Sequence, residues 1–565
     1  MLILLLLVFL LFAGRLVELQ GLRGDQLAAA AVDQRTTTVK VLADRGQIVD
    51  TNGVPLAQTL EARNITADQT LIEDPRAAAE ALAPILAANP VELAERLTGD
   101  RRFVYVAKDQ SPQAWRRIQE LGIAGIFSER TTKRVYPAGN VAANVVGFVG
   151  DEGDGLAGVE YAQEEILAGV DGWRTYERAA GGAAIPTADV SAQEPVPGTD
   201  IQLTIDRDIQ YVAQRALTEA VESSGAESGS VVVMDPRTGH VLALATAPTF
   251  DANDPGAADA ADLGNRALTD AFEPGSTAKV MTIAAVLEEG GAKPDTVFQI
   301  PPVLERSGKV FHDASEHGGY EWDLTTLLAQ SSNIGTILAA ETIPQDTFYD
   351  YLGRFGIGEP TGLGFPGETS GYLPAMEEWS GTTFPTLAFG QGFSVNSVQM
   401  ASVFATIAND GVRVPPSLVV NPDVGDAPLD GERVVSAETA RSVRTMLEKV
   451  VGDGGTAPLA AIPGYGVGGK TGTAQVINAD CGCYDGSTVG SFIGMAPIQQ
   501  PEVVVAVTIV KPRVEQLGGE LAGPVFREVM TYALQARKVA PYVTMQGDPR
   551  GATASEVRDV DRSNG

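Results

Sequence analysis

Two pairs of apolar strands, one near the middle of the chain and one near its C-terminus, limit the fold most strongly. The first pair is SVVVMDPRTGHVLALAT, in which residues 236–239 separate two apolar runs, and the second is VGSFIGMAP with EVVVAVTIVKP around 499–501. A turn signal between two such runs predicts an antiparallel hairpin. Helical segments lie between the pairs, and a last helix is expected over about 522–537. This order predicts an α+β fold, an antiparallel sheet flanked by helices.

The chain begins with an unbroken apolar run, MLILLLLVFLLFAG, followed by Arg15 and a mixed helix. A membrane span needs about 20 apolar residues, which the run reaches only if Leu16 and Val17 extend it. No lysine or arginine precedes the run, so either a basic flank lies upstream of Met1 or the run is a cleaved signal. No A-x-A cleavage site follows, which favours an uncleaved anchor over 1–22. We therefore expect a single-pass protein of the cytoplasmic membrane whose remaining residues are extracytoplasmic.

With 565 residues the chain is too long for a single core and should divide into domains. Residues 28–195 contain short strands and alanine-rich helices, including a strand expected over 43–50 and a helical stretch punctuated by Pro84 and Pro90. The segment PGTDIQLTID opens a second large domain, 196–540. Residues 541–565 are polar and rich in glycine and serine, and are expected to be disordered.

The charge and the sparse histidines and cysteines exclude several function classes. A formal net charge of −31 disfavours nucleic acid and anionic lipid as partners, because both would be repelled. No P-loop and no metal-ligand spacing is present, so neither a cofactor nor a metal is expected. His240, His312 and His317 fall in turns or loops without a nucleophile-partner motif, which argues against a Ser-His-Asp triad. Cys481 and Cys483 could form a strained disulfide or remain free thiols.

The stretch FEPGSTAK, residues 272–279, contains the best candidate nucleophile. Pro274 and Gly275 break the preceding loop, and TAKVMTIAAVLEEG predicts a helix that places Ser276 at its N-terminus and Lys279 one turn later on the same side. Serine is a weak nucleophile unless a base removes its proton, and lysine can be that base only if its pKa is lowered. Taken alone, S-x-x-K is short and common, and an N-cap serine before a surface lysine would explain it equally well.

Two further motifs strengthen this interpretation. Ser331-Ser332-Asn333 separates two apolar helical segments, and Lys470-Thr471-Gly472-Thr473 follows a glycine-rich run and leads into an expected strand. The whole chain has only ten lysines, and two of them occupy motif positions. The ordered set S-x-x-K, S-x-N and K-T-G resembles the penicillin-recognising serine enzymes, which comprise penicillin-binding proteins and serine β-lactamases.

That resemblance implies a role for each residue of the acylation step. Lys279, kept neutral by burial and by the positive charge of Lys470, would take the proton of Ser276 as the hydroxyl attacks a carbonyl. The backbone N–H groups of Ser276 and Thr473 would form the oxyanion hole. Gly472 would leave room for a peptide lying alongside the strand.

It also implies how the substrate is held. Ser331 would relay a proton to the leaving amine, and Asn333 would hold a substrate amide. Thr471 and Thr473 would bind the terminal carboxylate. In this family the substrate is the D-Ala-D-Ala end of a peptidoglycan stem peptide, and β-lactams acylate the same serine.

The N-terminal half resembles the pedestal of class B penicillin-binding proteins. The matching pieces are Arg45-Gly46 to Gly53, Tyr136-Pro137, and Gly158 to Gly169, and no glycosyltransferase segment is recognisable. The resemblance implies a membrane anchor, an elongated pedestal and a transpeptidase domain, most similar to the division-type FtsI group. It also implies a SEDS-family glycosyltransferase and divisome membrane proteins as partners. The alternatives are an elongation-type transpeptidase, a β-lactamase and a non-catalytic β-lactam receptor.

Overall fold

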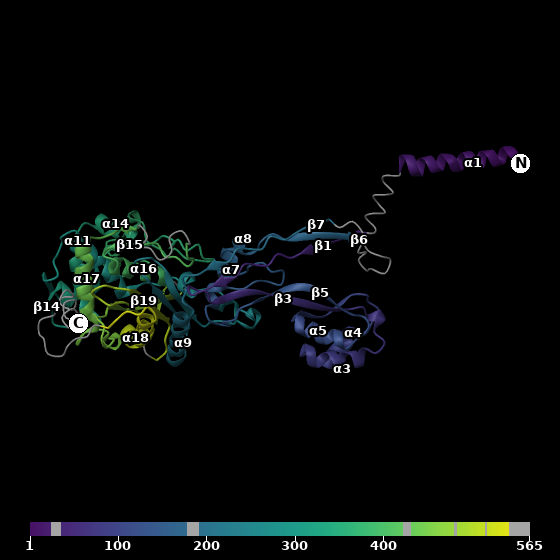
Figure 1. Ribbon diagram of the computed structural model, residues 1–565. Helices are drawn as coiled ribbons and strands as arrows, with labels where there is room; N and C mark the ends of the chain where they lie inside the picture. Colours follow the sequence, from purple (N-terminus) through teal and green to yellow (C-terminus); the bar gives the residue numbers. More distant parts are fainter. Residues whose placement is uncertain (24–35, 178–190, 422–430, 479–482, 515–516, 542–565) are drawn as a thin grey trace, which may run out of the picture.

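The computed structural model describes residues 1–23, 36–177, 191–421, 431–478, 483–514 and 517–541. A helix-rich head lies at one end of the folded part and a smaller lobe at the other, joined by long strands (Figure 1). All of the expected tail except Pro541, and Cys481 of the possible Cys481–Cys483 pair, lie outside the described residues. The predictions made for them remain predictions.

The N-terminal helix α1 spans Leu2–Val17 and continues into a π-helical turn, η1, at Glu18–Leu22. The helical stretch Leu2–Gly21 is 20 residues long and contains an 18-residue window with a mean hydropathy of 2.6, so it is long and apolar enough to cross a membrane. None of the side chains of α1 is buried against the rest of the described chain. An apolar helix without a protein partner fits a single-pass anchor.

Two sheets build the elongated pedestal. The first is an antiparallel ribbon in the order β1-β6-β7, and in the second β3 pairs with β2, β4 and β5 while β2 also pairs in parallel with β8. Their bounds are β1 Thr36–Val41, β2 Ile48–Val49, β3 Pro55–Ala67, β4 Val104–Gln110, β5 Ile126–Val135, β6 Gly172–Glu177, β7 Ser191–Gln193 and β8 Ile201–Gln202.

Three helices cover one face of the β4-β3-β5 sheet and enclose the smaller of the two cores. They are α3 Pro75–Leu86, α4 Pro90–Leu97 and α5 Pro112–Glu120, and their Leu82, Leu93 and Ile118 pack against Ile65 and Val106 of the sheet. The predicted helical stretch is therefore present, with Pro90 at the first position of α4 where its missing N–H costs nothing. Pro84 does not interrupt the stretch as expected, because it lies inside α3.

The strand expected over 43–50 is largely wrong. Only Ile48–Val49 are paired as a strand. The backbone before them bonds to two other segments instead, because Asp44 O accepts the N–H of Gly198 at 2.9 Å and Gly46 bonds to the end of α8, Glu164–Leu167. Gly46 N donates to Leu167 O at 2.9 Å, and a Cβ atom on Gly46 would lie 2.1 Å from Thr199 O. Such close approach of backbones needs glycine at that position.

A buried ion-pair cluster ties the pedestal strands together where they meet the head. The carboxylate of Glu160, which is fully buried, accepts hydrogen bonds from Arg45 Nε and Arg134 Nε, both at 2.7 Å. Tyr136 donates its hydroxyl to the same carboxylate at 3.2 Å. A buried charge of this kind is tolerated only when it is fully paired.

The head is built on a five-stranded antiparallel sheet in the order β10-β9-β19-β18-β17. The strands are β9 Ser228–Met234, β10 Val241–Ala247, β17 Gly468–Asn478, β18 Cys483–Ala496 and β19 Val503–Val510. Both predicted hairpins are present, and they join edge to edge because β19 pairs with β9. The helices α9 Arg207–Ser224 and α18 Gly518–Ala536 pack on the sheet, as does α16 Ser397–Ala408. The α+β prediction is confirmed.

A layer of helices and small two-stranded sheets completes the head. The helices are α10 Arg266–Thr269, α11 Lys279–Glu288, α12 Leu324–Ala329, α13 Asn333–Ala340, α14 Gln345–Arg354, α15 Thr383–Ala388 and α17 Ala437–Val451. The strands are β11 Val297–Ile300, β12 Leu304–Arg306, β13 Lys309–Phe311, β14 Tyr320–Asp323, β15 Val412–Arg413 and β16 Glu432–Arg433. Three short helices, α6 Ala143–Val146, α7 Gly158–Ala162 and α8 Glu164–Leu167, belong to the pedestal near its junction with the head. Helix α11 is buried over nearly all of its length, not only along the expected apolar face.

Candidate active site

The candidate nucleophile lies in a tight turn that leads into α11. Residues Gly275–Ala278 form the 3₁₀ turn η5, in which Ser276 is partly exposed while its neighbours are buried. Gly275 has φ +53° and donates its N–H to Gly390 O at 2.9 Å. A Cβ on Gly390 would lie 1.9 Å from Gly275 O, so this contact requires glycine. The turn is therefore fixed from outside, and Ser276 stands at the N-terminal end of a buried helix.

Lys279, one turn after Ser276, is completely buried. Its Nζ donates hydrogen bonds to Ser331 O at 2.5 Å and to Asn333 Oδ1 at 2.8 Å, and it lies 3.2 Å from Ser331 Oγ. Burial lowers the pKa of Lys279 well below its usual value, and the nearby positive charge of Lys470 lowers the pKa further. A neutral amine with two hydrogens on fixed acceptors keeps its lone pair for a hydroxyl proton. This is the state that a general base needs.

Lys470 is the second buried lysine of the site. It lies on β17, and its Nζ donates to the backbone oxygen of Thr471 at 3.2 Å. Burial lowers the pKa of Lys470 from 10.5 to about 7. At neutral pH this lysine can therefore supply a positive charge inside the site, or give it up, for a small free-energy cost.

The S-x-N motif forms the corner between α12 and α13, as the sequence predicts. Ser331 has φ +60°, in the left-handed region that costs a serine about 1–2 kcal/mol. Both of its oxygen atoms lie within hydrogen-bonding distance of Lys279 Nζ, which holds this conformation. Ser332 is the N-cap of α13 and accepts the N–H of Gly335 at 2.8 Å. Asn333 then begins the helix with its side-chain oxygen directed at Lys279.

The K-T-G motif lies on β17, the edge strand of the sheet beside the nucleophile turn. Thr471 is buried, and its Oγ1 lies 3.0 Å from Thr456 Oγ1. The exposed Thr473 accepts a hydrogen bond from Gly518 N at 3.3 Å. Of the two hydroxyls, that of Thr473 is the more accessible to a ligand.

The structure gives a reason for glycine at position 472 that differs from the expected one, which was room for a peptide alongside the strand. A Cβ atom there would lie 2.4 Å from Ser491 Oγ and 3.1 Å from Pro274 O, so the glycine lets the nucleophile turn pack against the strand.

The geometry thus brings all four expected reacting groups to one place. Lys279 contacts the S-x-N corner directly, and Lys470 acts on Lys279 through its charge. No hydrogen bond joins Ser276 Oγ to Lys279 within the described part of the chain. The Ser276 N–H likewise has no protein acceptor among the described residues, so it is available to an oxyanion.

Comparisons with known proteins agree with this arrangement. A family model for the penicillin binding protein transpeptidase domain matches residues 229–531, and one for the penicillin-binding protein dimerisation domain matches residues 40–203. Penicillin-binding protein PbpB of Mycobacterium tuberculosis is 38% identical over 574 residues, covering 94% of this chain and 84% of that protein. This chain is a class B penicillin-binding protein.

Further relatives of this penicillin-binding protein are known. Peptidoglycan D,D-transpeptidase FtsI of Escherichia coli is 34% identical to it over 97% of this chain and 92% of the relative. A crystal structure of penicillin binding protein 3 from Mycobacterium tuberculosis, complexed with aztreonam, matches with a TM-score of 0.70 and 34% identity. It covers 89% of this chain and 98% of the other.

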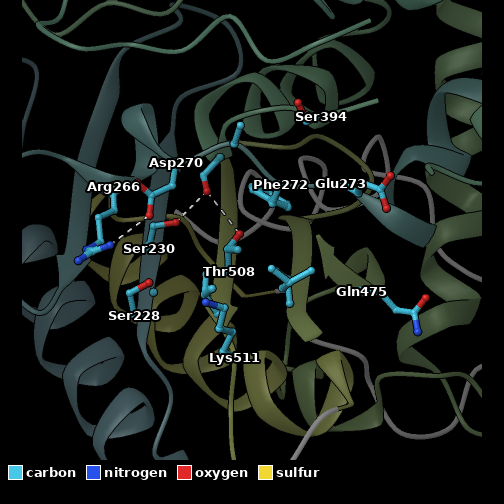
Figure 2. A pocket seen from close by; sticks show the side chains of 16 residues that line it. Ser228, Ser230, Arg266, Asp270, Phe272, Glu273, Ser394, Gln475, Thr508 and Lys511 are labelled. Carbon is cyan, nitrogen blue, oxygen red and sulfur yellow. Dashed lines mark hydrogen bonds and ion pairs between the residues drawn. The ribbon is translucent and has the colours of Figure 1, made fainter. Parts of the chain in front are cut away.

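A cavity of about 440 Å³ in this penicillin-binding protein lies beside the nucleophile turn, not at it. Figure 2 shows Phe272 and Glu273 on its wall. On the same wall, hydrogen bonds link Ser230 to Ser397 and Ser397 to Thr508. None of the four expected reacting residues lines it.

Glu273 connects this cavity wall to the sheet. Its carboxylate accepts hydrogen bonds from Gly392 N at 2.8 Å and from the hydroxyl of Tyr484 at 3.1 Å. Burial raises the pKa of Glu273, and burial beside this carboxylate raises the pKa of Tyr484 to about 12. These two bonds fasten the segment just before Ser276 to Gly392 and to strand β18.

Sequence reasoning missed Asp313, which contacts the S-x-N motif, and His317, which contacts Asp313. Asp313 accepts hydrogen bonds from the backbone of Asn333 and Ile334, and His317, which was expected to be an ordinary loop residue, lies against Asp313 with its side chain 2% exposed. No local motif marks this pair, because its partners lie about twenty residues further along the chain.

Proposed function

We propose that this class B penicillin-binding protein cross-links peptidoglycan stem peptides during septal wall synthesis, with Ser276 as the nucleophile. The enzyme is a serine-type peptidoglycan D,D-transpeptidase. The observation that carries the residue assignment is the burial of Lys279 against Ser331 and Asn333, one turn after Ser276. A buried lysine with a lowered pKa in that place is suited to proton transfer.

In the acylation step, Ser276 Oγ attacks the carbonyl carbon of the penultimate D-alanine while its proton passes to Lys279 Nζ. The N–H groups of Ser276 and Thr473 stabilise the oxyanion. The C–N bond to the terminal D-alanine then breaks, and Ser331 relays a proton to the leaving amine. An amine of a second stem peptide attacks the acyl-serine to form the cross-link and restore Ser276.

The remaining motif residues hold the substrate. Asn333 donates one Nδ2 hydrogen to His312 O at 3.1 Å, which leaves the other for a substrate carbonyl. Lys470, Thr471 and Thr473 bind the terminal carboxylate. Gly472 keeps the nucleophile turn close to β17, the strand along which the peptide lies.

The cellular setting is part of the proposal. Helix α1 anchors the chain in the cytoplasmic membrane with the pedestal and head extracytoplasmic, and the domain boundaries are 28–195 and 196–540. The FtsI relative supports a division role, with an elongation role as the alternative. A SEDS-family glycosyltransferase and divisome membrane proteins are the proposed partners.

The test is intact-mass analysis of the purified full chain after incubation with a penicillin. One covalent adduct is expected, on Ser276 by peptide mapping, and it should be absent in Ser276→Ala. Lys279→Ala should lower the acylation rate by roughly two to four orders of magnitude, because the general base is lost. An adduct elsewhere, or near-normal acylation of the Lys279 variant, would contradict the assignment.

The lifetime of that adduct separates a transpeptidase from a β-lactamase or a passive receptor. A lactamase needs a base that activates water at the acyl-enzyme, and no E-x-x-L-N pattern of the class A kind is present. The penicilloyl adduct should therefore persist for many minutes. Sustained nitrocefin hydrolysis that Ser276→Ala abolishes would favour the lactamase, and stable acylation without any stem-peptide cross-linking would favour the receptor.

A further inference from the structure

The loop between β13 and β14, residues 312–319, reaches across to the S-x-N corner of the active site. The carboxylate of Asp313 accepts four hydrogen bonds there. Its Oδ1 accepts from Asn333 N at 2.5 Å and Ile334 N at 3.0 Å, and its Oδ2 accepts from Ser332 Oγ at 2.8 Å and His317 Nε2 at 3.2 Å. One side chain thus fixes both the backbone and the N-cap of the motif.

His317 is held in a single orientation and tautomer. Its Nδ1 accepts the N–H of Gly319 at 3.1 Å, so the ring proton must be on Nε2, which donates it to Asp313. The ring also stacks on Tyr320, with centroids 4.3 Å apart and planes at 23°. With its side chain only 2% exposed, His317 has little freedom to turn away.

The same loop controls the side chain of Asn333. His312 O accepts from Asn333 Nδ2 at 3.1 Å, while Asn333 Oδ1 accepts from Lys279 Nζ at 2.8 Å. The position of the loop therefore sets the position of one of the acceptors that hold the proposed base.

The loop also contributes charge. The charged groups that act on Lys279 are Lys470 from β17 and Asp313 from this loop, and they oppose each other: Lys470 lowers the pKa of Lys279 and Asp313 raises it. Both act on a buried amine, where charges are poorly screened.

We propose that Asp313 and His317 are positioning residues for the acylation step: His317 orients the Asp313 carboxylate, and that carboxylate holds the S-x-N corner against Lys279. The inference rests on the proposed role of Lys279. Neither residue touches the reacting atoms, so each acts through the corner that it holds.

Paired substitutions of His317 separate this role from simple packing. His317→Gln keeps an amide N–H for Asp313 and loses the stacked ring, whereas His317→Phe keeps the ring and loses the donor. Because a buried carboxylate loses one hydrogen bond, we expect the second-order rate constant for penicillin acylation to fall roughly tenfold in His317→Phe and much less in His317→Gln. The opposite order would show that stacking is the function and would overturn the proposal.

The pH profile of acylation in Asp313→Asn is a second readout, because a residue that only packs would leave this profile unchanged. Removing a negative charge near Lys279 lowers the pKa of that amine, so the acid limb of the acylation pH profile should shift to lower pH while the maximal rate falls. Glu316→Gln, an exposed carboxylate of the same loop, is the matched control and should leave both unchanged.

All variants are measured as full chains by intact mass, with melting temperatures recorded alongside. If Asp313→Asn acylates at a near-normal rate with an unshifted pH profile, the inference is overturned. The proposed function would still stand in that case, provided that the wild type acylates. Failure of the wild type to acylate would instead overturn the proposed function. If Asp313→Asn does not fold, the His317 pair still decides the question.

Discussion

Replacing Lys470 with methionine should make the protein more stable while it destroys the active site. Burial lowers the pKa of Lys470 from 10.5 to about 7, so the unfolded chain binds a proton between these values that the folded chain does not. At 1.36 kcal/mol for each pKa unit, the buried lysine lowers the free energy of unfolding by about 5 kcal/mol below pH 7 and by about 4 kcal/mol at pH 7. Methionine has a similar volume and no charge, and it avoids this cost.

The net gain is smaller because methionine loses the hydrogen bonds that Lys470 Nζ makes to Thr471. With about 1 kcal/mol assigned to that loss, Lys470→Met should gain about 3 kcal/mol at pH 7. In a large domain this is a rise of about 6 °C in melting temperature, at roughly 2 °C for each kcal/mol. Penicillin acylation should fall sharply in the same variant.

The pH dependence is the sharper test. The folded pKa is lowered, so wild-type stability falls as pH drops from 10.5 towards about 7, and the advantage of Lys470→Met should shrink as pH rises from 7 and vanish near 10.5. Scanning calorimetry of the full chain from pH 6 to pH 9.5 measures this. Lys449→Met, at an exposed lysine of α17, is the control and should show no such trend. A destabilised Lys470→Met, or an advantage independent of pH, would refute the reasoning.

Three further outcomes are expected. Gly472→Ala should reduce acylation and destabilise the head by about 1–3 kcal/mol, since its Cβ would press on Pro274 O, whereas Gly256→Ala, with no atom within 4 Å, should be silent in both assays. Glu160→Gln should cost about 3–5 kcal/mol in urea unfolding, because Arg45 loses a buried partner; a loss under 1 kcal/mol would count against a structural role for the cluster. Acylation should be indifferent to EDTA, and activity that chelation removes and zinc restores would reveal a metal site that we did not expect.

The sequence predicts the site better than it predicts the contacts that support it. Ser276, Lys279, Ser331 and Lys470 could be named as candidates because each belongs to a short motif and the order of motifs is specific; their catalytic roles remain predictions. The hairpins could be found because apolar runs flank clear turn signals. The lowered pKa of Lys279 follows once the motifs converge, since two ammonium groups cannot both stay charged in one dry site.

The supporting contacts could not be predicted because no local pattern encodes them. Asp313 bonds to the backbone of Asn333 only because the loop over 312–319 folds back onto the S-x-N corner. Arg45 bonds to Glu160, which lies 115 residues further along the chain. Helix α18 begins at Gly518, earlier than expected, because its glycines fit against β17, where a Cβ on Gly518 would lie 2.2 Å from Gly472 O. Out of context these glycines indicate a loop.

The edge position of β17 has a consequence for selectivity. No other described strand pairs with its outer side, so a peptide can add there through backbone hydrogen bonds, which depend little on the amino-acid sequence. Attachment at such an edge distinguishes poorly between one extended peptide and another. We therefore expect many peptides to dock weakly and only those whose terminal carboxylate and scissile carbonyl both fit to acylate Ser276. Discrimination would then appear in kcat and not in KM.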